Sequence, residues 1–369
     1  MENMVILSSP LWNGVPVFIT GHTGFKGSWL SFWLQELGAK VHGYALDPLG
    51  GANLFDTLRL SEKVESDTRA NLKDIAHLRA ALNIAQPRVV FHLAAQAFVN
   101  EGYINPIETF ETNVLGTVNL LEALRELQCV KAVVIVTSDK VYQVTESAHR
   151  HQESDPLGGE DPYSASKAAA EMVSACYRSS YFQQSTTQNS VRIATARAGN
   201  VIGGGDWSPN RLVPDCLSAF RNGSPVKLRF PTAIRPWQHV IEALSGYLLL
   251  AEKLMASTSE EYSRAWNFGP AESSDATVAE IAEKLATLWG TGASIEYDKG
   301  TARIKEVQQL RLDASLANRK LGWQPRRNLD MALRETVEWY KGWVNNSDME
   351  VLTRLQIQRY CYLGRFGDN

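Results

Sequence analysis

Two side chains one helical turn apart offer acid and base chemistry. Tyr163 and Lys167 form a Tyr-x-x-x-Lys spacing, so on a helix they would share one face. An ammonium held close to a phenol favours the phenolate, which can accept a proton from a hydroxyl group while a hydride leaves the same carbon. The pair indicates oxidation of an alcohol, although this short motif alone is a weak signal.

A second polar cluster, Thr137-Ser138-Asp139-Lys140, follows directly on the apolar run at residues 132–136. If that run is a buried parallel strand, its carboxyl end lies at the sheet edge where cofactor and substrate meet in doubly wound folds. We therefore expect Ser138 to converge with Tyr163. Without the Tyr/Lys pair, the simpler interpretation would be that Ser138 caps the strand end and that Asp139 and Lys140 form a solvated ion pair.

A glycine-rich turn between an apolar run and a helical pattern is suited to hold phosphates. It consists of Gly21, His22, Thr23, Gly24, Phe25, Lys26 and Gly27. Glycines at this spacing allow a tight turn, a close approach of the backbone to a pyrophosphate, and close packing of helix on strand. Asp47 follows the next strand and is placed to meet a ribose, or is a turn carboxylate before Pro48. Asp67 is a weaker candidate for an adenine contact.

Short apolar runs alternate with helical patterns through the first half of the chain. We expect strands at residues 15–20, 40–46, 88–93, 132–136 and 191–197, with helices at 28–37, 113–127 and 164–176. This alternation is typical of βαβ units, so we predict an α/β protein with a doubly wound parallel sheet. Right-handed crossovers would bring the carboxyl ends of all strands to one edge.

The pattern changes after residue 197, where Gly- and Pro-rich loops run as far as Pro236. We interpret this as the start of a second unit with helices at 241–255, 278–289 and 329–343. The length of 369 residues also favours two packed units. The segment at 345–369 shows no clear pattern.

The composition limits the possible partners. Lys and Arg number 37 and Asp and Glu 40, and this near-neutral balance argues against a nucleic-acid partner. The sequence shows neither the ~18-residue apolar run of a membrane span nor a basic start typical of a signal peptide, so we expect a cytoplasmic protein with no membrane partner. The 4 cysteines are far apart and show no zinc-site spacing, so we expect reduced thiols and no metal.

Five motifs in order resemble those of extended short-chain dehydrogenases/reductases that act on nucleotide sugars. They are Thr20-Gly-x-x-Gly-x-x-Gly27, Leu93-Ala-Ala-Gln96, Thr112-Asn-Val-x-Gly-Thr117, Thr137-Ser-Asp-Lys140 and Tyr163-x-x-x-Lys167. Within that family, the runs at 21–29, 197–207 and 235–240 are similar to those of CDP-glucose 4,6-dehydratases. The resemblance implies a Rossmann-type doubly wound parallel sheet with a smaller C-terminal substrate-binding domain. The NAD-binding domain would consist of residues 1–200, to which the chain returns at 239–269. The smaller domain would comprise 201–238 and 270–369.

The resemblance also implies roles for individual residues. Tyr163 would be the base at the C4 hydroxyl of a glucosyl unit, Lys167 would tune it, and Ser138 would bind the same hydroxyl. Asp139 would be the acid for the departing C6 hydroxyl, and Lys140 either the base at C5 or an electrostatic stabiliser. The implied cofactor is NAD, held by the turn at 21–27 and by Asp47, Asp67, Leu93, Ala94, Ala95, Gln96, Thr112, Tyr163 and Lys167.

The implied substrate is CDP-glucose, whose product leads to dideoxyhexoses of bacterial surface polysaccharides. Its binding residues would be Asn200, Gly204 and Trp207 along the sugar nucleotide, Arg211, Arg229 and Arg235 at the pyrophosphate, and Trp237. Trp237 could equally belong to the core. We expect a homodimer or homotetramer.

Two other interpretations remain open. The chain could be a 4,6-dehydratase or 4-epimerase that acts on another nucleotide sugar, although an epimerase needs no elimination acid such as Asp139. It could also be a non-catalytic dinucleotide-sensing protein of the same fold. Such a protein would be free to lose Ser138, Tyr163 or Lys167, and all three are present.

Overall fold

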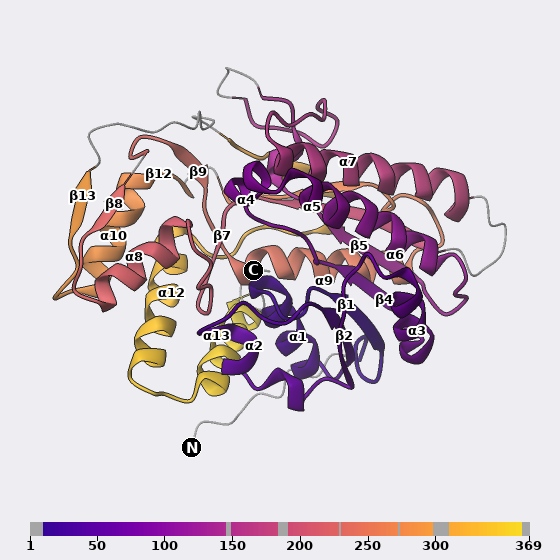
Figure 1. Ribbon diagram of the computed structural model, residues 1–369, viewed down its shortest axis with the longest axis horizontal. Coiled ribbons are helices and arrows are strands. Elements are labelled where there is room, and N and C mark those ends of the chain that lie inside the picture. Colours follow the sequence, from indigo (N-terminus) through magenta and orange to yellow (C-terminus); the bar gives the residue numbers. More distant parts are fainter. Residues whose placement is uncertain are drawn as a thin grey trace.

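The computed structural model describes residues 10–144, 149–183, 191–228, 230–271, 274–297 and 310–363. Its centre is a seven-stranded parallel sheet in the order β11-β6-β5-β4-β1-β2-β3 (Figure 1). These strands are β1 (Pro16–Thr20), β2 (Lys40–Ala45), β3 (Ser66–Arg69), β4 (Val89–His92), β5 (Ala132–Val136), β6 (Arg192–Ala198) and β11 (Ala265–Phe268). The predicted doubly wound parallel sheet is confirmed.

Helices cover both faces of this sheet, because its strands are apolar on both sides. Successive side chains on a strand point to opposite faces. On β1, Val17 and Ile19 pack into the core with α1 (Phe25–Glu36) and α9 (Val240–Ala256), whereas Phe18 faces α3 (Ile75–Ala85) and α6 (Gly116–Leu124). Next to α6 on this second face lies α7 (Pro162–Tyr177). Each large apolar side chain buried in this way contributes about 1.5–3 kcal/mol.

The strand order reverses between β1 and β4, which is where doubly wound sheets bind ligands. The ends of the two strands are joined by side chains: Thr20 Oγ1 lies 2.7 Å from His92 Nδ1, and His92 Nε2 lies 3.1 Å from Thr117 Oγ1 on α6. The buried ring of His92 thus bonds on both sides. These bonds hold the carboxyl ends of β1 and β4 together at the point where the glycine-rich turn begins.

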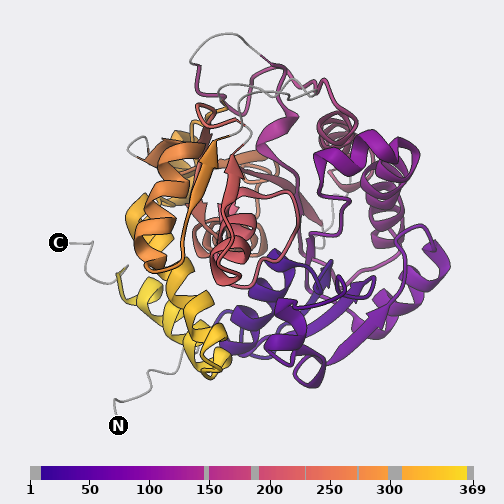
Figure 2. The same ribbon diagram turned by 60° about the vertical axis from the view of Figure 1, so that its left-hand side comes forward.

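A second group of elements lies on the side of the molecule away from α3 and α6 (Figures 1 and 2). In it, β8 (Val226–Leu228) pairs with β13 (Ile295–Tyr297), and α10 (Val278–Trp289) packs on α8 (Leu212–Arg221) and α12 (Leu329–Val344). Two further pairs, β7 (Val201–Ile202) with β10 (Gln238–His239) and β9 (Ile234–Pro236) with β12 (Asp275–Thr277), connect this group to the sheet edge.

The remaining elements are short, apart from one helix. They are α2 (Leu54–Thr57), η1 (Leu60–Glu62), α4 (Val99–Ile104), α5 (Pro106–Phe110), the π turn η2 (Glu111–Leu115), η3 (Asp139–Val141), η4 (Arg178–Phe182), α11 (Ser315–Leu321) and α13 (Met349–Leu363). The helix expected at 113–127 therefore begins in a π turn, and α8 and α13 were not predicted. None of the helices in the described part of the chain combines the length and apolar character that crossing a bilayer requires.

Candidate active site

Ser138, Tyr163 and Lys167 meet at the carboxyl edge of the sheet. Asp161 caps the start of α7 by accepting a hydrogen bond from the Ser164 N–H at 3.0 Å, which fixes the turn that carries Tyr163. Tyr163 and Lys167 are buried, and Ser138 is hydrogen-bonded to the phenol of Tyr163. Lys167 Nζ donates to the Val136 carbonyl at 3.1 Å, which ties α7 to the end of β5.

Burial shifts the pKa values of this phenol and this ammonium in opposite directions. It raises the pKa of Tyr163, and the hydrogen bond between this phenol and Ser138 opposes the shift. Burial, with a smaller contribution from the charge of Lys26, lowers the pKa of Lys167 to about 7. Burial therefore favours the neutral form of each group. An anion placed beside Lys167 would favour the ammonium, and the ammonium would in turn favour the phenolate.

Asp139 lies beside this group at the start of η3 and is only 3% exposed. Ser138 Oγ donates to its Oδ1 at 3.1 Å, and its buried Oδ2 has no hydrogen-bond partner within the described chain. Burial raises the pKa of the carboxyl, although Lys140, the hydrogen bond from Ser138, and Arg235 oppose the shift. A carboxyl in this environment can hold a proton at neutral pH and give it to a leaving group.

Three cations act on Asp139, and a fourth acts on one of them. Lys140 is adjacent in η3, while Lys26 from α1 and Arg235 from β9 interact electrostatically with the carboxylate. Lys26 also feels the charge of Arg211, which precedes α8, and burial followed by this repulsion lowers the pKa of Lys26 to about 8. Asp206 belongs to the same group, since its Oδ2 lies 3.4 Å from Arg211 Nη1 and its charge also acts on Lys26. Because two carboxylates do not balance four cations, the site favours an anionic ligand such as a diphosphate.

The glycine-rich turn fits a dinucleotide. Gly21 adopts φ +76°, and a Cβ there would lie 2.6 Å from the Ala94 nitrogen. A Cβ on Gly27 would lie 2.0 Å from the Gly21 carbonyl oxygen, so α1 packs too closely on the turn for any other residue. Gly24 is exposed and begins α1 without a capping side chain. The first N–H groups of α1 therefore remain available to a phosphate.

The other residues of the turn are fixed by their neighbours. Thr23 Oγ1 donates to the Leu46 carbonyl at 3.0 Å, and Phe25 lies against Gly203. The buried His22 Nε2 lies 2.8 Å from Asp67 Oδ1. Asp67 is thus engaged with the turn itself.

An arginine joins the two predicted acidic residues. Arg69 donates to Asp67 from Nε at 2.6 Å and from Nη2 at 2.8 Å, and its Nη1 lies 3.5 Å from Asp47 Oδ1. Asp47 is 87% exposed on its side chain, so its carboxylate is open to a ribose. Arg69 was not among the predicted residues, and only the third strand ending Asp-Thr-Arg could have pointed to it.

The segment after β4 lies against the turn. Ala94 N–H donates to Thr20 Oγ1 at 3.2 Å, so Leu93, Ala94 and Ala95 run beside Gly21. Gln96 is held through Asn113, which accepts from the Gln96 N–H at 2.8 Å and donates to Ser166 Oγ on α7 at 2.8 Å. The hydroxyl of Thr112, in contrast, donates to Glu108 on the preceding helical turn at 3.2 Å. Asn113 therefore positions the segment, a role that was not predicted for it.

Several predicted substrate residues are tied into packing. Gly204 lies against Trp339, since a Cβ there would be 2.0 Å from the ring, and Trp207 packs in an aromatic cluster with Trp339, Tyr340 and Trp343. Trp237 is buried, with Nε1 donating to the Ala276 carbonyl at 3.1 Å. The Asn200 carbonyl accepts from the Gln238 N–H at 3.1 Å. Arg229 lies outside the described residues.

A buried ion pair behind the site was missed by the sequence analysis. Glu171 accepts from Arg197 Nε at 2.9 Å, from Thr137 Oγ1 at 2.5 Å and from Thr195 Oγ1 at 2.6 Å. Glu171 follows Lys167 by one turn of α7, and Arg197 is the second-last residue of β6, which is buried along its whole length. A charged residue in a buried strand needs an oppositely charged partner, so Arg197 in this strand was the sequence signal that could have predicted the pair. The pair holds α7 against β5 and β6.

Comparisons with known proteins agree with this arrangement. The family model described as GDP-mannose 4,6 dehydratase matches residues 18–336. A CDP-glucose 4,6-dehydratase from Salmonella typhimurium is 46% identical over 96% of this chain and 98% of that protein. A UDP-glucose 4-epimerase from Bacillus subtilis is 26% identical over 89% of this chain and 98% of that protein.

Two solved structures are similar over most of the chain. The UDP-glucose 4-epimerase of Thermus thermophilus in complex with NAD has a TM-score of 0.74 and 26% identity, covering 88% of this chain and 99% of that one. The dTDP-glucose 4,6-dehydratase of Bacillus anthracis in complex with NAD has a TM-score of 0.72 and 23% identity, covering 89% and 97%, and shows the fold alone. The chain belongs to the GDP-mannose 4,6-dehydratase family, within the extended short-chain dehydrogenases/reductases.

Proposed function

We propose that this protein is an NAD-dependent CDP-glucose 4,6-dehydratase, which converts CDP-glucose to CDP-4-dehydro-6-deoxyglucose and water. The observation that carries this proposal is the buried carboxyl of Asp139, with a raised pKa and an unpartnered oxygen, beside Ser138, Tyr163 and Lys167. Oxidation of an alcohol alone needs only the latter three. The 46% identity to the Salmonella CDP-glucose 4,6-dehydratase supports the choice of nucleotide.

Oxidation at C4 of the glucosyl unit falls to three residues. NAD, when bound, supplies reversible hydride transfer, accepting the C4 hydride and later returning it to C6. Tyr163 takes the proton of the C4 hydroxyl, and Ser138, already bonded to the phenol, holds the same hydroxyl. Lys167, one turn along α7, stabilises the phenolate while it is charged. A ketone at C4 results, and it acidifies the hydrogen at C5.

Loss of water falls to the two residues that follow Ser138. The C5–H bond breaks, and its electron pair forms the C5–C6 double bond as the C6–O bond breaks. Asp139 donates the proton with which the C6 hydroxyl leaves as water. Lys140 takes the C5 proton as a neutral amine, or it stays an ammonium that stabilises the enolate by its charge while a water molecule takes that proton. Return of hydride to C6 and of a proton to C5 completes the product, so no net oxidation occurs.

The cations around Asp139 provide the binding energy for the anionic part of the substrate. Arg235 and Arg211 would pair with the two phosphates, because a guanidinium binds phosphate oxygens bidentately. Lys26 belongs to the NAD turn and also interacts with Asp139 and Arg211, so its charge would act on both ligands. Asn200, Gly204 and Trp207 would line the sugar nucleotide, and Arg229 is a further candidate. The packing of Trp237 favours a core role over stacking on a base.

The two kinds of binding correspond to two domains in our proposal. Residues 1–200 and 239–269 contribute all seven strands of the central sheet and would bind NAD. Residues 201–238 and 270–369 would bind the nucleotide sugar. Within the second part, α13 also packs on α1 of the first, where Arg354 Nε donates to Glu36 at 2.6 Å.

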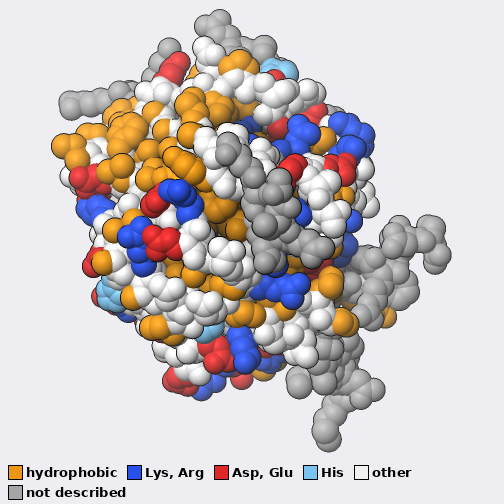
Figure 3. Space-filling model, turned by 90° about the vertical axis from the view of Figure 1, so that its right-hand side faces the viewer, with side chains coloured by type: hydrophobic (Ala, Val, Ile, Leu, Met, Phe, Trp, Pro, Cys, Tyr) orange, Lys and Arg blue, Asp and Glu red, His pale blue; other side chains and the backbone are white. Residues whose placement is uncertain are grey.

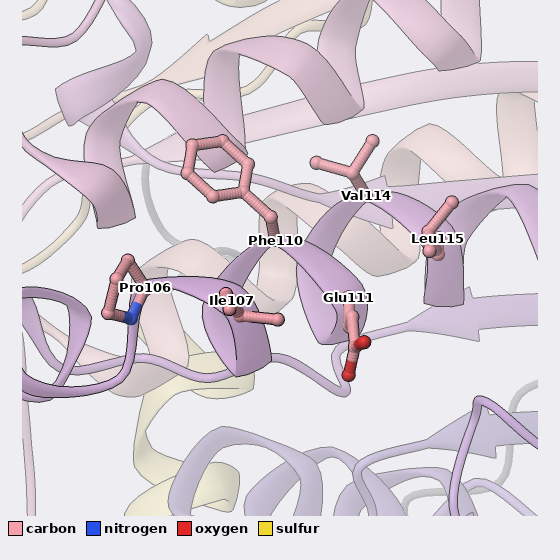
Figure 4. A pocket seen from close by; sticks show the side chains of 6 residues that line it. All are labelled: Pro106, Ile107, Phe110, Glu111, Val114 and Leu115. Atoms are coloured by element: carbon pink, nitrogen blue, oxygen red, sulfur yellow. The ribbon is translucent and has the colours of Figure 1, made fainter.

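The protein would act as a dimer of identical chains. Figure 3 views the side with α6 and α7 and shows hydrophobic side chains gathered on it. Close by, a groove along α5 and η2 is lined by Pro106, Ile107, Phe110, Glu111, Val114 and Leu115 (Figure 4). Ile107 is 75% exposed, and Met172 on α7 is also exposed. Exposed apolar side chains gathered on adjoining helices support an interface at this face, and a second copy of the same face is its simplest apolar partner.

We also propose that the enzyme acts in the cytoplasm. None of its four cysteines, all of which are described, forms a disulfide. This agrees with a reducing compartment.

The proposed reaction is tested by following labels rather than by detecting product alone. CDP-glucose carrying deuterium at C4 should give product with that deuterium at C6, and reaction in D2O should place one solvent deuterium at C5. Mass spectrometry and proton NMR measure both. Return of the label to C4 without loss of water would identify an epimerase, and recovery of unchanged substrate from the NAD-saturated protein would identify a binding protein.

A further inference from the structure

We propose that His149, His151 and Asp155 form a binding site for one transition-metal ion of the Zn²⁺ type. The three residues lie between η3 and α7, outside the reacting groups. Each offers one ligand atom, and these atoms all lie within 4.8 Å of one another. In the described ranges no other group of three His, Cys, Asp or Glu residues is arranged in this way. Two imidazoles and one carboxylate are a ligand set that Zn²⁺ accepts, with water in the fourth position.

The distances leave room for an ion after a small movement. His149 Nε2 lies 2.6 Å from Asp155 Oδ2, and His151 Nδ1 lies 3.3 Å from the same oxygen. Ligand atoms about 2.0–2.2 Å from a tetrahedral zinc stand roughly 3.3 Å apart. The ring of His149 is 43% exposed and can therefore move outward. Without a metal, each ring donates from the nitrogen that faces the carboxylate. In a metal complex, the lone pair of that nitrogen would bind the ion and the ring proton would sit on the other nitrogen.

Two of the three ligands are already oriented by the fold. The His151 N–H donates to the Arg311 carbonyl at 2.9 Å, and its carbonyl accepts from the Asp313 N–H at 2.9 Å. The Gln152 N–H donates to Asp155 Oδ2 at 3.1 Å.

The site is coupled to the catalytic segment through an aromatic stack. The His151 ring lies parallel to that of Tyr142, with centroids 4.6 Å apart and an interplanar angle of 5°. Tyr142 follows Lys140 by two residues, and its hydroxyl donates to Asn267 Oδ1 at 2.6 Å. A bound ion would therefore brace the turn at 149–155 against the segment that carries Asp139, while taking no part in the reaction.

The test uses the full-length, untagged protein with NAD bound, after removal of metal by a chelator. Titration with Co²⁺ should develop visible d–d absorbance that saturates at one ion per chain. Competition of Zn²⁺ with a chromophoric chelator should give a dissociation constant of about 10 μM or lower. His149→Gln and Asp155→Asn should each weaken Zn²⁺ binding by at least about tenfold. His149 is exposed, so its replacement does not endanger folding.

The matched control is His77→Gln, which replaces an exposed histidine on α3 and should leave metal binding unchanged. The proposal is overturned if the wild-type protein binds no ion in this range. It is equally overturned if His149→Gln and Asp155→Asn bind Zn²⁺ as tightly as the wild type. Both readouts are independent of turnover, so failure of the proposed reaction would not affect them.

Discussion

Asp139 is the residue whose environment separates dehydration from simple alcohol oxidation. Asp139→Asn keeps the size of the side chain and removes its proton-donating carboxyl. We expect formation of the 4-keto-6-deoxy product to fall by about 10²-fold or more, because general acid catalysis is lost, while the affinity for NAD stays the same. Product is measured by its alkaline absorbance and NAD affinity by calorimetry. An undiminished rate would show that another group supplies the proton.

Burial of the Lys167 ammonium lowers the stability of the folded protein, and this loss can be measured. The pKa of Lys167 is about 7 in the fold, mainly through burial, against an ordinary value of 10.5. Between these values the unfolded chain holds the proton and the folded chain has lost it, so stability rises with pH and the penalty is complete below about pH 7. Lys167→Met removes this penalty together with activity.

Without NAD, we expect the Met variant to exceed the wild type in free energy of unfolding by about 1–3 kcal/mol near pH 6.5, after the loss of the hydrogen bond to Val136. The advantage should shrink towards about pH 9.5. Urea unfolding at the two pH values measures it. A difference in stability that does not change with pH would contradict the lowered pKa of Lys167 in the folded protein.

Arg235 is expected to act on the substrate and not on the cofactor. Arg235→Ala should raise KM for CDP-glucose by at least about tenfold, the loss of one charge-assisted contact, and leave NAD affinity unchanged. Arg235→Lys keeps the charge without the bidentate geometry, so its KM for CDP-glucose should lie between those of the wild type and Arg235→Ala. Because Arg235 is buried, circular dichroism must show that both variants fold. Equal losses of substrate and NAD affinity would argue against a phosphate contact.

The turn between β1 and α1 depends on close packing of backbone on backbone. A Cβ on Gly27 would meet the Gly21 carbonyl at 2.0 Å, so we expect Gly27→Ala to destabilise the protein by at least about 2 kcal/mol and to abolish NAD binding. The matched control is Gly50→Ala, since nothing lies within 4 Å of a Cβ at that position. Urea midpoints and NAD titration compare the two. Similar stability of both variants would refute the packing argument.

The elements that local patterns could predict are those whose burial is continuous along the chain. β5 and α10 have the bounds that were expected, because an uninterrupted apolar run and a regular apolar stripe mark them. The buried face of α13 instead includes Thr353 and Gln356. Their partners are Trp339 Nε1 and the Glu335 carbonyl on α12, at 3.0 and 2.8 Å. A polar residue satisfied by a distant element breaks the stripe, so the sequence alone did not reveal this helix.

The same distinction applies to the site. Ser138, Tyr163 and Lys167 could be placed together because each follows a recognisable strand or lies on a recognisable helix. Asn113 and the pair Glu171 and Arg197 were not predicted, because their importance depends on contacts with segments 17 to 53 residues away. Such residues hold the elements in place, and only the folded arrangement assigns them that role.

At the scale of the whole molecule, the groove along α5 and η2 is expected to be covered by a second chain. Ile107→Glu places a charge in that groove, so we expect it to convert the assembly to monomers, as measured by light scattering after gel filtration. Ile84→Glu is the control, because Ile84 on α3 is 77% exposed and does not line the groove. An unchanged molar mass for Ile107→Glu would exclude this face as the interface.

The proposed reaction requires that one chain bind both NAD and a cytidine sugar nucleotide and remove water from the sugar. The most direct measurement is turnover of the NAD-loaded protein on separate samples of CDP-glucose, dTDP-glucose, UDP-glucose and GDP-mannose, followed by the absorbance of the 4-keto-6-deoxy product in alkali. We predict product from CDP-glucose and little or none from the other three. Product from another nucleotide in preference to CDP-glucose, or from none, would contradict it.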